Sequence, residues 1–305
     1  QLIALDAHSG LPVSSFGKNG FVDLHTGLPE VAAEKFIISN TPGAIYDDLI
    51  IMPCRLSEGS DAAPGDIRAF NVITGSLAWT FHVIPYPDES GYETWENKRA
   101  YLNTEGIGAG NNWAGMTVDP EHGVLYIPTG SLAPDFYGGH RPGSNLYANS
   151  LLALDAKTGK LKWYQQLTHH DIWDRDLPAA PNLVKINHDG KSIQAVVQTT
   201  KQGYVYVFDK FTGEPVFPIE EMKVPGSNLE KSWPTQPIPT SPAPYARLSS
   251  ELTVDDFSPY APNREEIVKV LSEMNKSFYQ PPDTIPTLLL PGYDGGAEWG
   301  GAGVD

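Results

Sequence analysis

The chain has 305 residues, of which 40% are hydrophobic and 10% aromatic, a composition that is ample for a packed globular core. Its formal net charge of -16 would repel phosphate backbones and anionic headgroups, so binding to nucleic acid or to a membrane through a basic patch is not expected. No apolar run approaches the roughly 20 residues that are needed to span a bilayer.

The first residues, Gln1–Asp6, read as the middle of a strand, with no initiator methionine and no polar lead-in. We therefore expect the chain to be an incomplete piece of a larger protein, and a secretion signal would lie outside it. The single cysteine, Cys54, permits no internal disulfide and is by default a small buried hydrophobic residue.

One turn motif occurs four times after strand-like residues, with Asp or Asn at its start and Gly four residues later. The four starting residues are Asp6, Asn71, Asp155 and Asp209. Because an Asp or Asn side chain caps a tight turn and Gly supplies a positive φ, each copy predicts a β-hairpin. In two copies a tryptophan follows the Gly by four residues, at Trp79 and Trp163, where it would pack between sheets.

Successive copies are separated by 65, 84 and 54 residues, which exceeds the roughly 40–45 residues of an ordinary propeller blade. Long insertions, which usually lie on one face of a propeller and build its site, would account for the difference. Further strands are predicted at 48–52 and 123–127. The whole chain, 1–305, is thus expected to form a single all-β propeller domain that is truncated at both ends.

Proline is frequent from about 218 to 291, and we expect this segment to be an irregular insertion with one helix near 263–276 and no strands. Its length favours an ordered excursion over the propeller rather than a flexible linker. After it, Trp299–Asp305 repeats the pattern of Trp113–Asp119, so the chain is expected to end within a blade.

The densest polar segment is Thr168–Asp176, which holds two histidines and three aspartates directly after a predicted strand. These residue types suggest a metal site, but the spacing fits zinc poorly because adjacent histidines in an extended chain point to opposite faces. A solvated, charged loop with an aromatic plug explains the segment equally well. The residues alone leave both interpretations open.

Several motifs, in order along nearly the whole chain, resemble the pyrroloquinoline quinone (PQQ)-dependent dehydrogenases. They are the repeated Ala-x-Asp-x-x-Thr-Gly-x-x-x-Trp, Asn112-Trp113-Ala114-Gly115, His170-Asp171-x-Trp173-Asp174 and Thr200-Lys201-Gln202-Gly203. The resemblance implies an eight-bladed quinoprotein β-propeller, of which about four to five blades would be present here. It also implies a PQQ- and calcium-dependent oxidation of an alcohol, polyol or aldose hydroxyl, by proton abstraction and hydride transfer to the quinone.

The same resemblance implies roles for particular residues. Trp113 would form the flat floor beneath the quinone, and Trp299, at the matching position of the second copy, is a further cofactor-binding candidate. Asp174 would take the proton from the substrate hydroxyl, with Asp171 as the fallback. Lys201 would bond the quinone oxygens and stabilise negative charge as the ring is reduced.

Oxygen ligands for a hard cation are also implied, namely Glu58, Ser131 and Asp174. The cation is calcium in most of the family, and a lanthanide or another divalent ion is left open. Ser131 departs from the family pattern, since alcohol-oxidising members have Asn at this position. Arg55 and Asn40 are candidates to bind the PQQ carboxylates, and the guanidinium of an arginine can bond a carboxylate bidentately.

Two features favour the glucose-dehydrogenase-like branch over methanol-type enzymes. Lys201 stands where methanol-type members carry Arg, and Cys54 alone cannot form their disulfide between adjacent cysteines. The implied enzyme is periplasmic, either soluble or attached to the inner membrane through parts outside this chain, and passes electrons to cytochrome c or ubiquinone. Residues 1–305 alone are expected to be inactive, because an open propeller exposes strand edges. The alternative is a non-catalytic propeller that acts as a binding or scaffold protein.

Overall fold

Strands dominate the structure, a computed structural model that describes residues 1–305, and they form seven small antiparallel sheets. The prediction of an all-β fold is therefore confirmed. Two sheets have four strands each in the up-and-down order of a propeller blade. The first contains β4 (Ala44–Tyr46), β5 (Leu49–Met52), β7 (Ile67–Asn71) and β8 (Leu77–Phe81); the second contains β10 (Thr117–Asp119), β11 (Val124–Pro128), β13 (Ser150–Asp155) and β14 (Leu161–Gln166). Strands β5 and β11 confirm the two strands predicted between the turn motifs.

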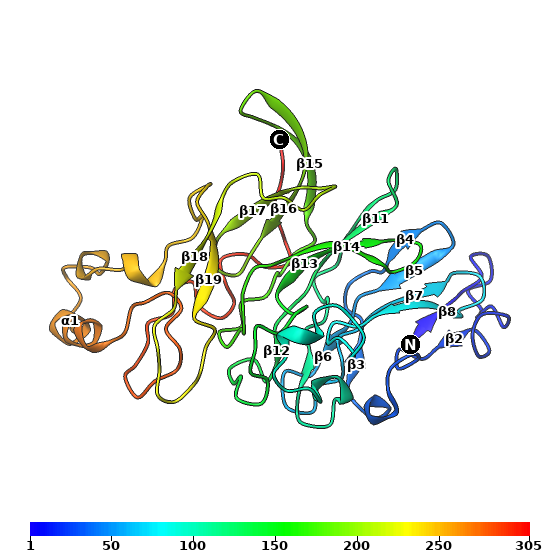
Figure 1. Ribbon diagram of the computed structural model, residues 1–305, viewed down its shortest axis with the longest axis horizontal. Helices are drawn as coiled ribbons and strands as arrows, with labels where there is room; N and C mark the ends of the chain where they lie inside the picture. The colour runs from blue at the N-terminus through cyan, green and yellow to red at the C-terminus, as the bar shows by residue number, and fades with distance from the viewer.

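The other sheets have two or three strands. They are β15 (Asn182–His188) with β16 (Lys191–Thr199) and β17 (Val205–Asp209), and the pairs β1 (Leu2–Ile3) with β2 (Phe21–Val22), β3 (Ile37–Ile38) with β6 (Arg55–Leu56), β9 (Gly108–Ala109) with β12 (Leu132–Ala133), and β18 (Ile219–Lys223) with β19 (Thr235–Pro239). Apart from the pairs β3–β6 and β9–β12, the sheets follow one another across the molecule in chain order, from β1–β2 near the N-terminus to β18–β19, and the two ends of this series lie apart (Figure 1).

Strand β13 explains why the central strands read as nearly continuous hydrophobic runs. Leu152 and Leu154 belong to the core that is shared with the preceding four-stranded sheet. Leu151 and Ala153 belong to the core that is shared with β16 and β17. Because side chains alternate along a strand, each blade buries one face against each neighbour. The hydrophobic core therefore lies between the blades rather than inside any one of them.

The repeated turn forms as its residues predict. In both four-stranded sheets it joins the third strand to the fourth. Asn71 Oδ1 accepts hydrogen bonds from the backbone of Ile73 and Thr74, at 3.0 and 2.9 Å. Asp155 Oδ1 accepts from the Thr158 amide and hydroxyl, at 3.0 and 2.8 Å. The glycines of the four copies have φ between 70° and 73°, so each copy is the same left-handed closure.

The two repeat tryptophans connect successive blades. Trp79 Nε1 donates to the Ala156 carbonyl at 3.3 Å, and a Cβ on Gly159 would lie 2.5 Å from the Trp79 ring. In the next blade, Trp163 has the same relation to Gly213, where a Cβ would lie 2.6 Å from its ring. Each ring thus packs on the turn of the following blade, which confirms that these residues lie between sheets.

The proline-rich segment differs in part from the irregular insertion that was expected. It contains the pair β18–β19, because a two-stranded sheet consists only of edge strands, where Pro237 and Pro239 can be accommodated. Helix α1 (Arg264–Glu273) lies within the predicted range. Phe278 and Tyr279 belong to the main core, so the segment packs against the blades.

The remaining helices are short 3-10 helices. They are η1 (Glu30–Ala32), η2 (Tyr92–Thr94), η3 (Ala100–Leu102), η4 (Ser249–Glu251) and η5 (Val254–Asp256). None of the helices combines the length and the apolar character that crossing a membrane would require.

Candidate active site

A polar cavity of about 300 Å³ opens at one end of the blades. Most of its wall is built by loops that follow β5, β11, β14 and β16 or precede β4 and β10, and these leave the same end of their antiparallel sheets. Asp294 and Trp299 come from the segment after α1. Asp171 does not reach the wall, but the other eight residues that the sequence predicts for the site do. They are Asn40, Arg55, Glu58, Trp113, Ser131, Asp174, Lys201 and Trp299.

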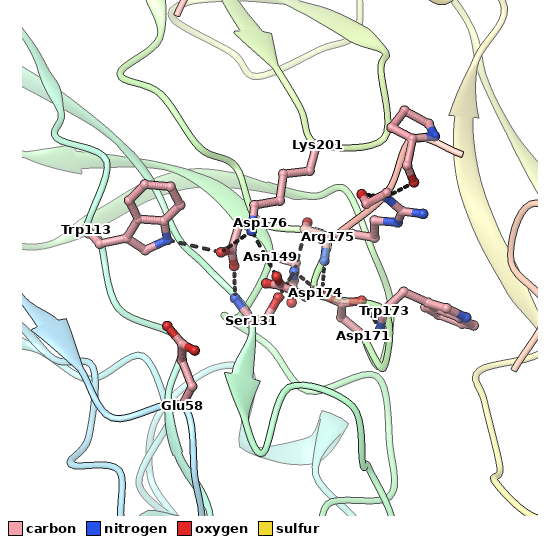
Figure 2. Close-up of polar contacts among 12 residues, drawn as sticks. Glu58, Trp113, Ser131, Asn149, Asp171, Trp173, Asp174, Arg175, Asp176 and Lys201 are labelled. Carbon is pink, nitrogen blue, oxygen red and sulfur yellow. Dashed lines mark hydrogen bonds and ion pairs between the residues drawn. The ribbon is translucent and has the colours of Figure 1, made fainter. Parts of the chain in front are cut away.

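Lys201 lies between two carboxylates of the turn that follows β14. Its Nζ is 3.0 Å from Asp174 Oδ2 and 3.2 Å from Asp176 Oδ2, and all three side chains are largely buried (Figure 2). Asp174 has a φ of 56°, a left-handed conformation that is uncommon for non-glycine residues. A cation and a carboxylate are therefore held side by side in the cavity wall.

Burial and charge alter the protonation of this wall. Burial, and then the Asp176 carboxylate, raise the pKa of Asp174 well above its usual range, although Lys201 opposes the shift. Burial alone would lower the pKa of Lys201, but Asp176 and Asp174 together raise it above its usual value. Burial, followed by Asp176, also raises the pKa of Asp135 to about 7. Lys201 is thus charged at neutral pH, in a cavity with more acids than its own cations neutralise.

The indole of Trp113 is held at its edge. Nε1 donates to Asp176 Oδ2 at 3.1 Å, and Lys201 Nζ lies 5.8 Å from the ring centroid. Trp299 is 55% exposed, and its ring centroid is 5.9 Å from that of Trp113, with 48° between the ring planes. The two tryptophans that match in the sequence thus meet in one cavity, where they offer flat apolar surface to a ligand.

Asp171 is fully engaged in hydrogen bonds within the protein. It is 2% exposed. Its Oδ2 accepts from Ser131 Oγ at 2.5 Å, Asn149 Nδ2 at 2.8 Å and Arg175 N at 2.6 Å. Its Oδ1 accepts from the Trp173 amide at 3.0 Å. These bonds brace the turn that follows β14, so the geometry gives Asp171 a structural task, and its catalytic role remains a prediction.

The three predicted metal ligands approach the cavity from two sheets. Ser131 and Asp174 follow β11 and β14 of one four-stranded sheet, and Glu58 follows β6 (Figure 2). The Ser131 hydroxyl donates to Asp171 and accepts from Asn149 Nδ2 at 3.2 Å, which leaves one lone pair of its oxygen for a cation. Glu58 is exposed and pairs with Arg55 at 3.3 Å. All three ligands present oxygen atoms, which suits a hard cation, and their joint coordination remains a prediction.

The sequence motifs did not identify several residues of the cavity. One of them is Asp176, whose carboxylate contacts Trp113, Ser131 and Lys201. It lies two residues after Asp174, and alternate residues of an extended segment share a side, so this spacing could have indicated it. Asn111 lies two residues before Trp113 and carries the same spacing signal. Asp135 and Asp294 come from other loops and carry no such signal.

The two adjacent histidines do not share a metal site. The ring of His170 is buried, with Nδ1 2.9 Å from the Gly143 carbonyl, and burial followed by Arg141 lowers the pKa of His170 to about 4. His169 Nδ1 instead lies 2.7 Å from Gln166 Oε1. This outcome agrees with the poor fit of their spacing to zinc.

Another group of possible ligands converges on the turn between β10 and β11, at Asp119, Glu121 and His122. Asp119 Oδ2 there is 2.7 Å from Lys210 Nζ and 2.9 Å from His122 Nδ1, so the carboxylate already has two partners within the protein. None of these residues lines the cavity. The ion pairs of this group tie β10 to the turn after β17.

Comparison with known families matches the whole chain, residues 1–305, to the PQQ model described as glucose/ethanol/alcohol dehydrogenase, beta-propeller domain. The chain is 34% identical over 317 residues to quinate/shikimate dehydrogenase (quinone) from Acinetobacter baylyi. It is 31% identical over 310 residues to quinoprotein glucose dehydrogenase from Escherichia coli. Both matches cover 100% of this chain and 38% of the relative, so the chain spans less than half the length of these curated relatives.

Among solved structures, the chain is similar to quinohemoprotein alcohol dehydrogenase from Comamonas testosteroni, with a TM-score of 0.60 and 25% sequence identity. The superposition covers 78% of this chain and 35% of that chain. The propeller arrangement of the sheets therefore has a counterpart in a solved structure.

Proposed function

The chain belongs to the PQQ-dependent glucose/ethanol/alcohol dehydrogenase β-propeller family, as its motifs predict, and on this premise we propose that it forms the catalytic wall of a quinoprotein dehydrogenase. The substrate would be an alcohol, polyol, sugar or other hydroxyl compound. The observation that carries the proposal is the convergence of Trp113, Asp174 and Lys201 in one cavity. A scaffold protein would have no need to gather these groups.

The cavity fits a planar quinone in shape and chemistry. Its volume of about 300 Å³ lies at the lower end of ordinary ligand pockets, roughly 300–1,000 Å³. The indole of Trp113 offers a flat face, and Ala109 and Gly130, which also line the cavity, leave room beside it. Arg55 and Asn40 bring donors for carboxylates to the same wall. When bound, PQQ would supply the two-electron acceptor for oxidation of the substrate carbon.

A hard cation is the second implied component, and the charges of the wall support it. Five carboxylates line the cavity against the two cations Arg55 and Lys201; they belong to Glu58, Asp135, Asp174, Asp176 and Asp294. Such an excess of oxygen donors attracts a divalent ion, with Glu58, Ser131 and Asp174 as the proposed ligands. A bound cation would also favour the ionised form of Asp174, which the protein alone disfavours.

The chain's own residues would then divide the work. Asp174, as a carboxylate on the wall, would accept the proton of the substrate hydroxyl. Lys201, charged and fixed between two acids, would stabilise negative charge that develops near its ammonium group. Trp113 would hold the planar ligand by stacking. Asp171 would act through the turn that it braces, rather than on the substrate.

The electron acceptor and the compartment form part of the same proposal. The name of the Acinetobacter baylyi relative specifies a quinone, and the similar solved structure is a quinohemoprotein, so ubiquinone or a cytochrome c is the proposed acceptor. We place the enzyme in the periplasm, as its sequence resemblance implies. Cell fractionation against a periplasmic marker enzyme would test this location.

Addition of PQQ and calcium to the intact protein would test the activity, with reduction of a redox dye as the measurement. The substrate panel should contain glucose, other aldoses, glycerol, simple alcohols and quinate. We expect dye reduction with at least one of them, and its loss when calcium is removed by a chelator. A flat response to every substrate, with cofactor shown to be bound, would favour the scaffold alternative.

A further inference from the structure

The function proposed above uses Asp176 only as one of the acids of the wall, yet three groups from three segments converge on its carboxylate. Trp113 Nε1 donates to Oδ2 at 3.1 Å, and Lys201 Nζ lies 3.2 Å from the same oxygen. The backbone amide of Ser131 donates to Oδ1 at 2.5 Å. The three donors come from the loop before β10, the loop after β11 and the loop after β16. Figure 2 shows Asp176 between Trp113 and Lys201.

The chain makes room for this contact. A Cβ on Gly130 would lie 2.7 Å from Asp176 Oδ1 and 3.2 Å from Trp113 Nε1, which is too close for any side chain. Asp176 is 7% exposed, so its hydrogen bonds are sheltered from water and hold their partners firmly. The carboxylate and the edge of the indole thus form one packed unit.

Asp174 and Asp176 therefore differ although they share Lys201. Asp174 has the lysine ammonium as its hydrogen-bond partner and otherwise faces the cavity. Asp176 is bonded to an indole edge, a backbone amide and the ammonium at once. One acid is left for chemistry and the other is committed to holding neighbours.

We propose that Asp176 is a positioning residue that fixes the tilt of the Trp113 ring and the place of the Lys201 ammonium relative to the bound quinone. The inference rests on the proposed function and deepens it. Since one carboxylate binds both the floor indole and the cation, these two contacts of the cofactor are coupled. Asp176 acts through them and does not touch the substrate.

The test replaces Asp176 with Asn in the intact protein and measures PQQ binding by titration and the induced circular dichroism of the bound cofactor. Asp176→Asn removes the charge and leaves an amide that cannot accept from all three donors. We expect roughly 10-fold weaker PQQ binding, the lower end of the effect of removing a supporting contact, and an altered dichroism band. Asp155→Asn is the control, because it makes the same change from carboxylate to amide in the turn between β13 and β14, away from the cavity. It should leave the band shape unchanged.

A second variant, Trp113→Phe, keeps a ring but removes the N–H that Asp176 accepts, and it decides the question if Asp176→Asn fails to fold. It should alter the band as well, and in the double variant the second substitution should add little, because the two residues share one contact. An unaltered band and affinity in the foldable variants would overturn the positioning role. Failure of the unaltered protein to bind PQQ would instead refute the proposed function.

Discussion

The blades have a turn end, where the repeated turns such as Asn71–Gly75 and Asp155–Gly159 lie, and a cavity end, where the polar cavity opens. The aspartates at these two ends have opposite shifts in pKa. At the turn end, burial alone would raise the pKa of Asp155, but the hydrogen bonds that its carboxylate accepts from its own turn together hold that pKa below the usual value. At the cavity end, burial and a second carboxylate raise the pKa of Asp174. The carboxylate of the turn aspartate is bonded by a residue three positions away, whereas Asp174 is crowded by Asp176, two positions away, and bonded by Lys201 of the next sheet. Local satisfaction marks the scaffold, and crowding of charge marks the site.

Left-handed backbone, in contrast, occurs at both ends. At the turn end it is found at the repeat glycines, such as Gly75 and Gly159, and at Asp47 (51°) in the β4–β5 hairpin. In the cavity wall it is found at Ala109 (59°) and Asp174 (56°). A non-glycine residue is held in this region only when its surroundings enforce it. The protonation of the aspartates, rather than backbone strain, therefore distinguishes the two ends.

The largest effect that separates the two ends is expected for Asp174→Asn. The amide cannot accept the substrate proton, so the turnover rate of the intact, cofactor-loaded protein should fall by roughly 10²–10⁴-fold. The melting temperature of the cofactor-free protein should not fall, because burial already favours the neutral form of Asp174 there. Steady-state kinetics and thermal unfolding would measure both quantities.

Asp155→Asn provides the matched control at the turn end. Asn71 occupies the equivalent position in another copy, so the turn should close equally well, with rate and stability near those of the unaltered protein. An Asp174→Asn variant that retained more than about a tenth of the activity would contradict the role assigned to Asp174 and would return Asp171 to consideration.

A smaller effect, on stability alone, is expected for Gly159→Ala at the turn end. The new methyl group would lie 2.5 Å from the Trp79 ring and would occupy a backbone with φ of +70°. Gly10→Ala imposes the same backbone strain, with φ of +71°, but nothing lies within 4 Å of its Cβ. Because overpacking costs about 1–3 kcal/mol, Gly159→Ala should lower the free energy of unfolding by about 2 kcal/mol more than Gly10→Ala. Urea unfolding would measure the difference, and equal losses would show that the Trp79 contact does not set the spacing of the blades.

The turn end could be predicted from sequence because its determinants are local. Asp or Asn, the following hydroxyl and the glycine lie within five residues, and repetition made the pattern specific. The packing of Trp79 and Trp163 followed from the same copies. The pair β18–β19 was not foreseen, because prolines in Thr235–Pro239 argue against a strand unless it lies at an edge, and edges are a property of the whole fold.

The cavity end could be predicted only where family motifs supplied the residues. Trp113, Asp174 and Lys201 were named in this way, and they do meet in one cavity. The hydrogen bond between Trp113 and Asp176 joins positions that are 63 residues apart, so no spacing rule predicts it. The engagement of Asp171 with Ser131 likewise depends on how the loops after β11 and β14 meet at one end of their sheet. Contacts of this kind are set by tertiary structure.

The smallest expected effect is the pH dependence of the turn itself, probed by Asp155→Ala. The variant loses an acceptor for the Thr158 amide and hydroxyl, and the loss of such a capping side chain costs about 1 kcal/mol or less at a partly exposed site. The folded-state pKa of Asp155 lies below its unfolded value of about 3.9, so its contribution is present above that pH and is lost as pH falls through the folded pKa. The difference in unfolding free energy between the unaltered protein and the alanine variant, measured in urea, should therefore be larger at pH 7 than at pH 3. The amide oxygen of Asp155→Asn accepts the same hydrogen bonds without a charge. The unfolding free energy of this variant should therefore exceed that of the alanine variant at both pH values. If the difference in unfolding free energy between the unaltered protein and Asp155→Ala increased on acidification, the fold would stabilise the protonated form of Asp155. The pKa of Asp155 would then be shifted in the same direction as that of Asp174, and the two ends would not differ in this respect.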